Sequence, residues 1–258
     1  MPNRSWTHEE TVLSLYLYFQ LPFGKLHSGN PEIQQLAEKI GRTHSSVAMK
    51  LGNFASLDPK ITESGRKGLA GATKLDRAVF AQFQSDWTGL VAEAEKLMSE
   101  ENLDSDASKF SELRTGFATI SFDGPSTVER IIGQRLGQSF FRRAVLANFD
   151  DHCCITGIAD SRLLNASHIV PWSDDLKNRH NPSNGLSLSA TFDRAFDRGL
   201  LTVRPNGTVE ISRQLVDGAN AETRAYFRRY QGTKITQSVR FPPDGELLRW
   251  HNEERYAG

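Results

Sequence analysis

The chain has 258 residues, of which 38% are hydrophobic and 24% are charged. This composition is typical of a globular protein with one large domain or two ordinary ones, and it excludes a fibrous or wholly disordered chain. Lysine and arginine number 31, as do aspartate and glutamate, so the formal net charge is zero. Any nucleic-acid surface must therefore come from local clustering of basic residues and not from overall basicity.

The only two cysteines, Cys153 and Cys154, are adjacent. They exclude a disulfide framework, and they exclude the paired CxxC motifs of a structural zinc site. The most apolar early run, TVLSLYLYFQL, is too short to span a bilayer and lacks the basic flank and cleavage site of a signal peptide. We therefore expect a cytoplasmic protein in a reducing compartment, with no membrane association.

The N-terminal sequence predicts three helices in succession. Thr7 has capping-box spacing to an acidic residue, and the apolar face that follows ends at Pro22. Asn30 can cap a second helix that ends at Gly41, and Thr43 can cap a third. Two helices joined by a short glycine-containing turn fit a helix-turn-helix, in which the second helix reads DNA.

The third helix carries polar side chains away from its apolar stripe. The candidates for DNA contact are His44, Ser45, Ser46, Lys50 and Asn53. The alternative is a small helical bundle that docks on the rest of the chain or on a partner. Both interpretations place a helical domain in residues 1–100, since residues 74–98 also have helical periodicity.

An acidic, serine-rich segment without periodicity, residues 101–113, predicts a linker between this domain and a second one at 114–258. The second domain begins with a predicted helix over residues 126–149, whose arginines include the candidate DNA contacts Arg142 and Arg143. The segments HCCITG and RLLNASHIV predict two strands, residues 187–199 predict a helix, and LLTVRPNGTVEIS predicts an additional hairpin. The expected fold class is α+β.

This order of elements places a strand histidine, His168, against a helix that carries two acids. Asp193 and Asp197 are four residues apart and so share one helix face. Two carboxylates facing an imidazole would form a site for a hard divalent metal beside a general base, which is the equipment for metal-assisted phosphodiester hydrolysis. The alternatives are a structural core histidine, a solvated Asp193, and an Asp197 that pairs with a neighbouring arginine.

Several ordered motifs now resemble one family. The segments CITG, SHIVPW, NPSNGLSLS and FDRGL resemble those of the HNH endonucleases, also called His-Me finger or ββα-metal nucleases, and within them the bacterial restriction-type group. With RLGQSFFRRAVL and LLRWHNEERY, the resemblance extends over roughly residues 115–258. The segment before them also looks like the one that often precedes this nuclease.

The resemblance implies a role for each matched residue. His168 would be the general base, Asn184 would fix the loop and help to orient the histidine, and Asp193 would hold a divalent metal, with Asp197 as a second candidate ligand. Oxygen ligands favour Mg²⁺ or Mn²⁺ over Zn²⁺. The chain departs from the family where Ser167 replaces an acid or a histidine and where the family's Cys₄ zinc is missing.

Arginine suits phosphate contact, so Arg194 and Arg198 are candidate DNA ligands, although arginines near a helix C-terminus also complement the helix dipole. The sequence therefore predicts a divalent-metal-dependent DNA endonuclease of restriction or host-defence type. A homodimer is expected on geometric grounds, because one site cuts one strand. The alternatives are a DNA-binding regulator with a degenerate nuclease fold, and a nuclease that depends on base modification or on activation by a partner.

Overall fold

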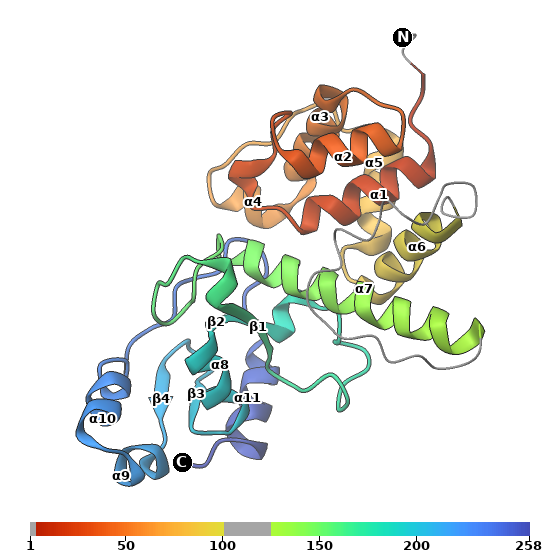
Figure 1. Ribbon diagram of the computed structural model, residues 1–258. Helices are drawn as coiled ribbons and strands as arrows, with labels where there is room; N and C mark the ends of the chain where they lie inside the picture. The colour runs from red at the N-terminus through yellow and green to blue at the C-terminus, as the bar shows by residue number, and fades with distance from the viewer. Residues whose placement is uncertain (1–3, 101–124) are drawn as a thin grey trace.

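The computed structural model describes residues 4–100 and 125–258 (Figure 1). The predicted linker, residues 101–113, lies outside the described residues. An N-terminal helical region precedes a region with helices and two small antiparallel sheets, so the predicted α+β class is confirmed. Among the described residues, no helix combines the length and apolar character needed to cross a membrane.

The N-terminal region contains six α-helices within the described residues. They are α1 (His8–Phe19), α2 (Pro31–Lys39), α3 (His44–Leu57), α4 (Pro59–Glu63), α5 (Lys74–Phe83) and α6 (Trp87–Glu100). The predicted caps are confirmed: Thr7 and Glu10 form a capping box, and the side chains of Asn30 and Thr43 cap α2 and α3. Gly41 has a φ of 62°, a left-handed conformation that favours glycine and ends α2.

The single helix expected over residues 74–98 is two helices in the structure. Asp86 causes the break, because its carboxylate accepts a hydrogen bond from the backbone N–H of Gly89 at 2.9 Å and so starts α6 anew. The second helix then turns to pack against α1 and α7. The apolar periodicity is similar on both sides of the break, so periodicity alone does not reveal it.

The C-terminal region begins with the long helix α7 (Pro125–Asn148). The strands are β1 (Leu164–His168), β2 (Gly185–Ser189), β3 (Leu201–Val203) and β4 (Val209–Ile211). The later helices are α8 (Ala190–Asp197), α9 (Arg213–Gly218), α10 (Ala221–Arg228) and α11 (Gly245–Glu254). Strand β1 pairs with β2, and β3 pairs with β4, both antiparallel.

The predicted strand at HCCITG is wrong, whereas RLLNASHIV contains the strand β1. Residues 152–157 form a turn in which Gly157 has a φ of 74°, and Cys153 and Cys154 are buried beneath it. The partner of β1 is Gly185–Ser189, so Leu188 lies in a strand and not in the predicted helix. The helix starts two residues later, where its own apolar residues begin to face the core.

The sheet formed by β1 and β2 packs between α7 and α8 (Figure 1). Because side chains alternate along a strand, Ala166 and His168 face one side of the sheet while Asn165 and Ser167 face the other. The side chain of His168 stacks on Phe141 of α7, and that of Asn165 bonds to α8. One short strand thereby presents residues to both helices.

The two regions share part of their cores. Phe140 and Ala144 of α7 belong to the hydrophobic cluster of the N-terminal helices, and Phe241 packs against the same cluster. The neighbouring Arg240 is 2% exposed, and its guanidinium donates hydrogen bonds to the carbonyl oxygens of Tyr18 and Leu21. These contacts fix the N-terminal helices against the region that contains β1 and α8.

Candidate active site

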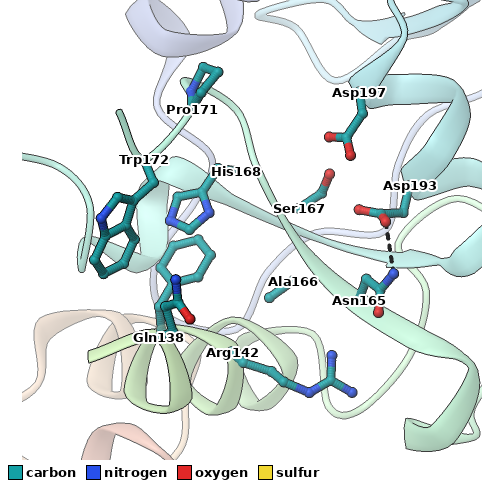
Figure 2. Close-up of a pocket in the computed structure, with 11 residues that line it drawn as sticks. Gln138, Arg142, Asn165, Ala166, Ser167, His168, Pro171, Trp172, Asp193 and Asp197 are labelled. Carbon is teal, nitrogen blue, oxygen red and sulfur yellow. Dashed lines mark hydrogen bonds between the residues drawn. The ribbon is translucent and has the colours of Figure 1, made fainter. Parts of the chain in front are cut away.

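A pocket of about 460 Å³ lies at the exposed edge of β1, between α7 and α8 (Figure 2). Its lining residues are Gln138, Phe141, Arg142, Asn165, Ala166, Ser167, His168, Pro171, Trp172, Asp193 and Asp197. Of the residues predicted from sequence, this pocket brings together His168, Asp193, Asp197 and Arg142. The mixture of an imidazole, two carboxylates and a guanidinium is suited to acid–base and phosphate chemistry.

His168 is held on three sides. Its ring stacks on Phe141 with centroids 3.6 Å apart and an interplanar angle of 8°. It also packs edge to face with Trp172, with ring centroids 5.7 Å apart. Its Nε2 atom lies 3.0 Å from the carbonyl oxygen of Arg179. A carbonyl oxygen can only accept a hydrogen bond, so Nε2 carries the proton in the neutral ring and Nδ1 keeps a free lone pair.

The electrostatic setting keeps this imidazole neutral. Burial lowers the pKa of His168 below its usual value, and the hydrogen bond to the Arg179 carbonyl only partly opposes that effect. Figure 2 shows one ring nitrogen on the side of the pocket where Asp193 and Asp197 lie. A neutral imidazole with a free lone pair facing the pocket can accept a proton there.

Asn184 is fully buried and closes the loop that follows β1. Its side-chain oxygen accepts a hydrogen bond from the Val170 backbone N–H at 2.9 Å, and its amide donates to the carbonyl oxygens of Val170 and Asn178. These three bonds tie together the two ends of the loop that carries Arg179. Asn184 does not line the pocket, and its contacts are with the backbone of the loop.

The two acids of α8 differ in their surroundings. Asp193 accepts a hydrogen bond from the Asn165 side chain at 2.7 Å (Figure 2). Asp197 is more exposed, yet partial burial raises its pKa, and the negative charge of Asp193 adds to that rise. A bound cation beside these carboxylates would offset the effect of the Asp193 charge on Asp197.

Ser167 supplies a further oxygen beside these acids. Its side chain is 2% exposed, and its hydroxyl oxygen has no hydrogen-bond partner within the described part of the chain. Figure 2 shows this hydroxyl directed toward Asp197. Because a buried hydroxyl without a partner costs free energy, the arrangement fits a group that the hydroxyl would contact when the pocket is filled.

The donor set fits a hard divalent cation only in part. No cluster of three histidine, cysteine or acidic side chains able to hold a metal occurs in residues 4–100 and 125–258. Asp193, Asp197 and the unpartnered hydroxyl of Ser167 offer three protein oxygens, and Mg²⁺ usually keeps several waters and substrate oxygens in its shell. The residues present therefore fit a cation that is shared with a phosphate and water.

The predicted basic contacts of this region fall into three groups. Arg142 lines the pocket and donates a hydrogen bond to the carbonyl oxygen of Ser161 at 3.0 Å. Arg143, one residue further along α7, points to the N-terminal helices and forms an ion pair with Glu32 of α2. Arg194 of α8 and Arg198, the C-cap residue of that helix, are exposed and do not line the pocket. The placement of Arg143 does not support a DNA contact.

The candidates on α3 divide in a similar way. Lys50 is 2% exposed, forms an ion pair with the buried Asp76 and lies over the Trp6 ring, and this placement does not support the expected DNA contact. Helical periodicity had placed Lys50 on a polar face, but α5 covers that face. Asn53 donates a hydrogen bond to the Gly71 carbonyl, at 3.2 Å.

Polar residues near the start of α3 remain available for a partner. His44 lies 3.8 Å from a carboxylate oxygen of Glu38, Ser45 is exposed, and Ser46 is partly exposed. The acid beside His44 does not favour binding to a phosphate. DNA contact by these three residues stays a prediction.

The pocket also contains residues that the sequence did not single out. Asn165 orients Asp193, Gln138 precedes Arg142 by one turn of α7, and Trp172 borders the His168 ring (Figure 2). Trp172 lies in the family-like SHIVPW motif, which is a signal for its importance. Asn165 and Gln138 become visible as site residues only when the strand register and the packing of α7 are known.

Comparison with protein families matches residues 153–204 to a family described as HNH endonuclease. The match covers the Cys153–Cys154 turn, β1, β2 and α8, and therefore His168, Asp193 and Asp197. A comparison with curated proteins finds no match for the chain. Residues 153–204 thus match the HNH endonuclease family, in agreement with the resemblance of the ordered motifs.

Proposed function

We propose that this chain is a DNA endonuclease of restriction or host-defence type that depends on a divalent metal and uses His168 as its general base. The observation that carries the proposal is the pairing of the His168 Nε2–H with the Arg179 carbonyl oxygen, which leaves Nδ1 free to accept a proton. The match to the HNH endonuclease family supports the nuclease class, and DNA is the substrate that this class implies.

In the proposed reaction, His168 and Arg142 have different roles. His168 would take a proton from a water molecule as that water attacks the scissile phosphorus, while the bond from phosphorus to the 3′ oxygen breaks. The products are a 5′-phosphate and a 3′-hydroxyl, which gains a proton from solvent. Arg142, at the pocket wall, would contact a phosphate oxygen and hold the strand in place.

Asp193, Asp197 and Ser167 would hold Mg²⁺ or Mn²⁺ at the opposite wall of the pocket. Such an ion supplies charge stabilisation for the phosphate and for the leaving oxygen. Asn165 keeps the Asp193 carboxylate turned into the pocket, and this is the task of an outer residue that orients a ligand. Arg194 and Arg198 would contact the DNA backbone outside the pocket.

One set of plasmid digestions tests this proposal. Plasmids of defined modification status are incubated with the protein and Mg²⁺ or Mn²⁺, and the product ends are sequenced. Cleavage with 5′-phosphate ends would support the nuclease, and a dependence on methylation would identify the modification-dependent alternative. Sequence-dependent DNA binding without metal-dependent cleavage of any plasmid would instead favour a regulator with a degenerate nuclease fold.

Double-strand cleavage would require two sites, so we also propose that two copies of the chain act on one DNA. Supercoiled plasmid distinguishes the possibilities, because a monomer produces the nicked circle first and a dimer produces linear DNA directly. Sedimentation of the protein with a DNA duplex measures the number of copies bound.

A further inference from the structure

His180 is a buried histidine outside the pocket. It is 7% exposed and lies in the loop between β1 and β2, next to Arg179. Its ring meets the ring of Trp172 edge to face at 5.0 Å, and Trp172 in turn meets His168 edge to face at 5.7 Å. His180 therefore contacts Trp172, a neighbour of the His168 imidazole, and does not itself line the pocket.

Two helices enclose this ring. On α6, the hydroxyl of Thr88 lies 3.3 Å from His180 Nδ1. On α7, Gly137 faces the same ring so closely that a Cβ atom there would lie 2.3 Å from His180 Nε2. Only glycine fits at position 137 with His180 in this place, so the missing side chain at Gly137 leaves the space in which the His180 ring packs.

Protonation of this ring would be unfavourable. Burial lowers the pKa of His180 to about 4, and the positive charge of Arg179 adds to the effect. A ring that stays neutral near pH 7 and does not reach the pocket is not a second general base. Its contacts instead fix the position of the backbone on which it sits.

That backbone holds His168. The carbonyl oxygen of Arg179 accepts the Nε2–H of His168, and the Arg179 guanidinium lies 5.1 Å from the centre of the Trp172 ring. Moving His180 would therefore disturb both the hydrogen bond at Nε2 and the aromatic edge beside the imidazole. The choice of the protonated nitrogen in His168 and the orientation of its ring therefore both depend on the packing of His180.

We propose that His180 is a positioning residue through which helix α6 of the N-terminal region holds His168 in its reactive orientation. The link runs from Thr88 through the His180 ring to the Arg179 carbonyl and the Trp172 ring. The expected effect of His180 on kcat rests on the proposed function. The expected effect of His180 on which nitrogen of His168 is protonated does not. It gives the N-terminal helices a role in the active site that does not require them to contact DNA.

The test compares full-length variants His180→Ala and Thr88→Val with the matched controls His152→Ala and Thr236→Val, which change exposed residues. Nitrogen NMR of histidine-labelled protein reports which ring nitrogen of His168 is protonated at pH 7.5. In the wild type and the controls, we expect a single form protonated at Nε2. In both test variants, we expect a mixture of the two forms.

Kinetics provides the second measurement. We expect kcat to fall by about 10- to 100-fold in His180→Ala, because small misplacements of a catalytic group are costly. Loss of one hydrogen bond in Thr88→Val should reduce kcat by about two- to tenfold. KM for DNA should stay unchanged in both. Thr88→Val exchanges a hydroxyl for a methyl at an exposed position, so it keeps the test valid if His180→Ala does not fold.

The proposal is overturned if either test variant, His180→Ala or Thr88→Val, is folded and keeps His168 protonated at Nε2 alone with the wild-type kcat. If the wild type cleaves no DNA, the proposed function fails, but the NMR comparison still decides whether His180 positions His168. A change of ring state in both test variants, with no change in the controls, would then support the positioning role alone.

Discussion

The Nε2 atom of His168 donates a hydrogen bond to the carbonyl oxygen of Arg179 at 3.0 Å. This contact fixes the tautomer of the ring, and the stack on Phe141 fixes its plane. Arg179 belongs to a loop whose ends are joined by Asn184. The chemistry of the site therefore depends on a backbone oxygen whose position is set by the folding of a loop.

The first prediction concerns pH. Because burial lowers the pKa of His168, the imidazole is neutral throughout the range from pH 7 to 8, and kcat/KM should be level there. As pH falls, the ring gains a proton and loses its lone pair, so activity should decline only below about pH 6.5. A pH profile with saturating Mg²⁺ measures this. A decline centred above pH 7 would contradict the assigned base.

The second prediction concerns the metal. Asp193→Asn keeps the shape of the side chain but removes its charge, so the Mn²⁺ concentration for half-maximal cleavage should rise by at least about tenfold. Direct Mn²⁺ binding, followed by electron paramagnetic resonance, should weaken in parallel. The control is Asp217→Asn, which changes an exposed acid on α9. Equal Mn²⁺ requirements for the two variants would exclude Asp193 as a ligand.

The third prediction uses two adjacent arginines of α7 as a matched pair. Arg142 lines the pocket, whereas Arg143 pairs with Glu32. Arg142→Gln should lower the slope of log affinity for DNA against log salt by about 1, since one phosphate contact is lost. Arg143→Gln should leave the slope unchanged. DNA binding is measured in Ca²⁺ over a series of salt concentrations. A lower slope for Arg143→Gln and an unchanged slope for Arg142→Gln would contradict the proposed phosphate contact of Arg142.

The fourth prediction concerns stability in the N-terminal region. Lys50 and Asp76 form a buried ion pair, so Lys50→Met leaves an uncompensated buried carboxylate. The free energy of unfolding, measured in urea, should fall by about 3–5 kcal/mol. Lys60→Met breaks an exposed pair with Glu63 and should cost less than about 1 kcal/mol. Similar losses for the two variants would show that Lys50 is not buried in solution.

The sequence predicted the helix caps and the meeting of His168 with Asp193 in one pocket, because local patterns and ordered motifs carry those signals. Capping at Thr7, Asn30 and Thr43 depends on side chains within three residues. His168 and Asp193 were placed together by the motifs of the family. Neither inference required knowledge of the tertiary packing.

What the sequence could not predict depends on long-range contacts. The segment HCCITG was predicted as a strand, but it forms a turn in which Cys153 and Cys154 are buried. Lys50 and Arg143 were expected to contact DNA. Their ion-pair partners, Asp76 and Glu32, lie on other helices, so the local sequence does not reveal these pairs. The placement of Ser167 likewise needed the structure, which shows its buried hydroxyl beside Asp197 with no hydrogen-bond partner among residues 4–100 and 125–258.

The most direct test of the account is the cleavage of plasmid DNA by His168→Ala in Mg²⁺, with DNA affinity measured in parallel. Cleavage should fall by at least about 100-fold, the low end of a general base's contribution, while affinity stays within a factor of a few. His152→Ala, an exposed histidine, should cleave as the wild type does. Full cleavage by a folded His168→Ala protein would contradict the assignment of His168 as the base.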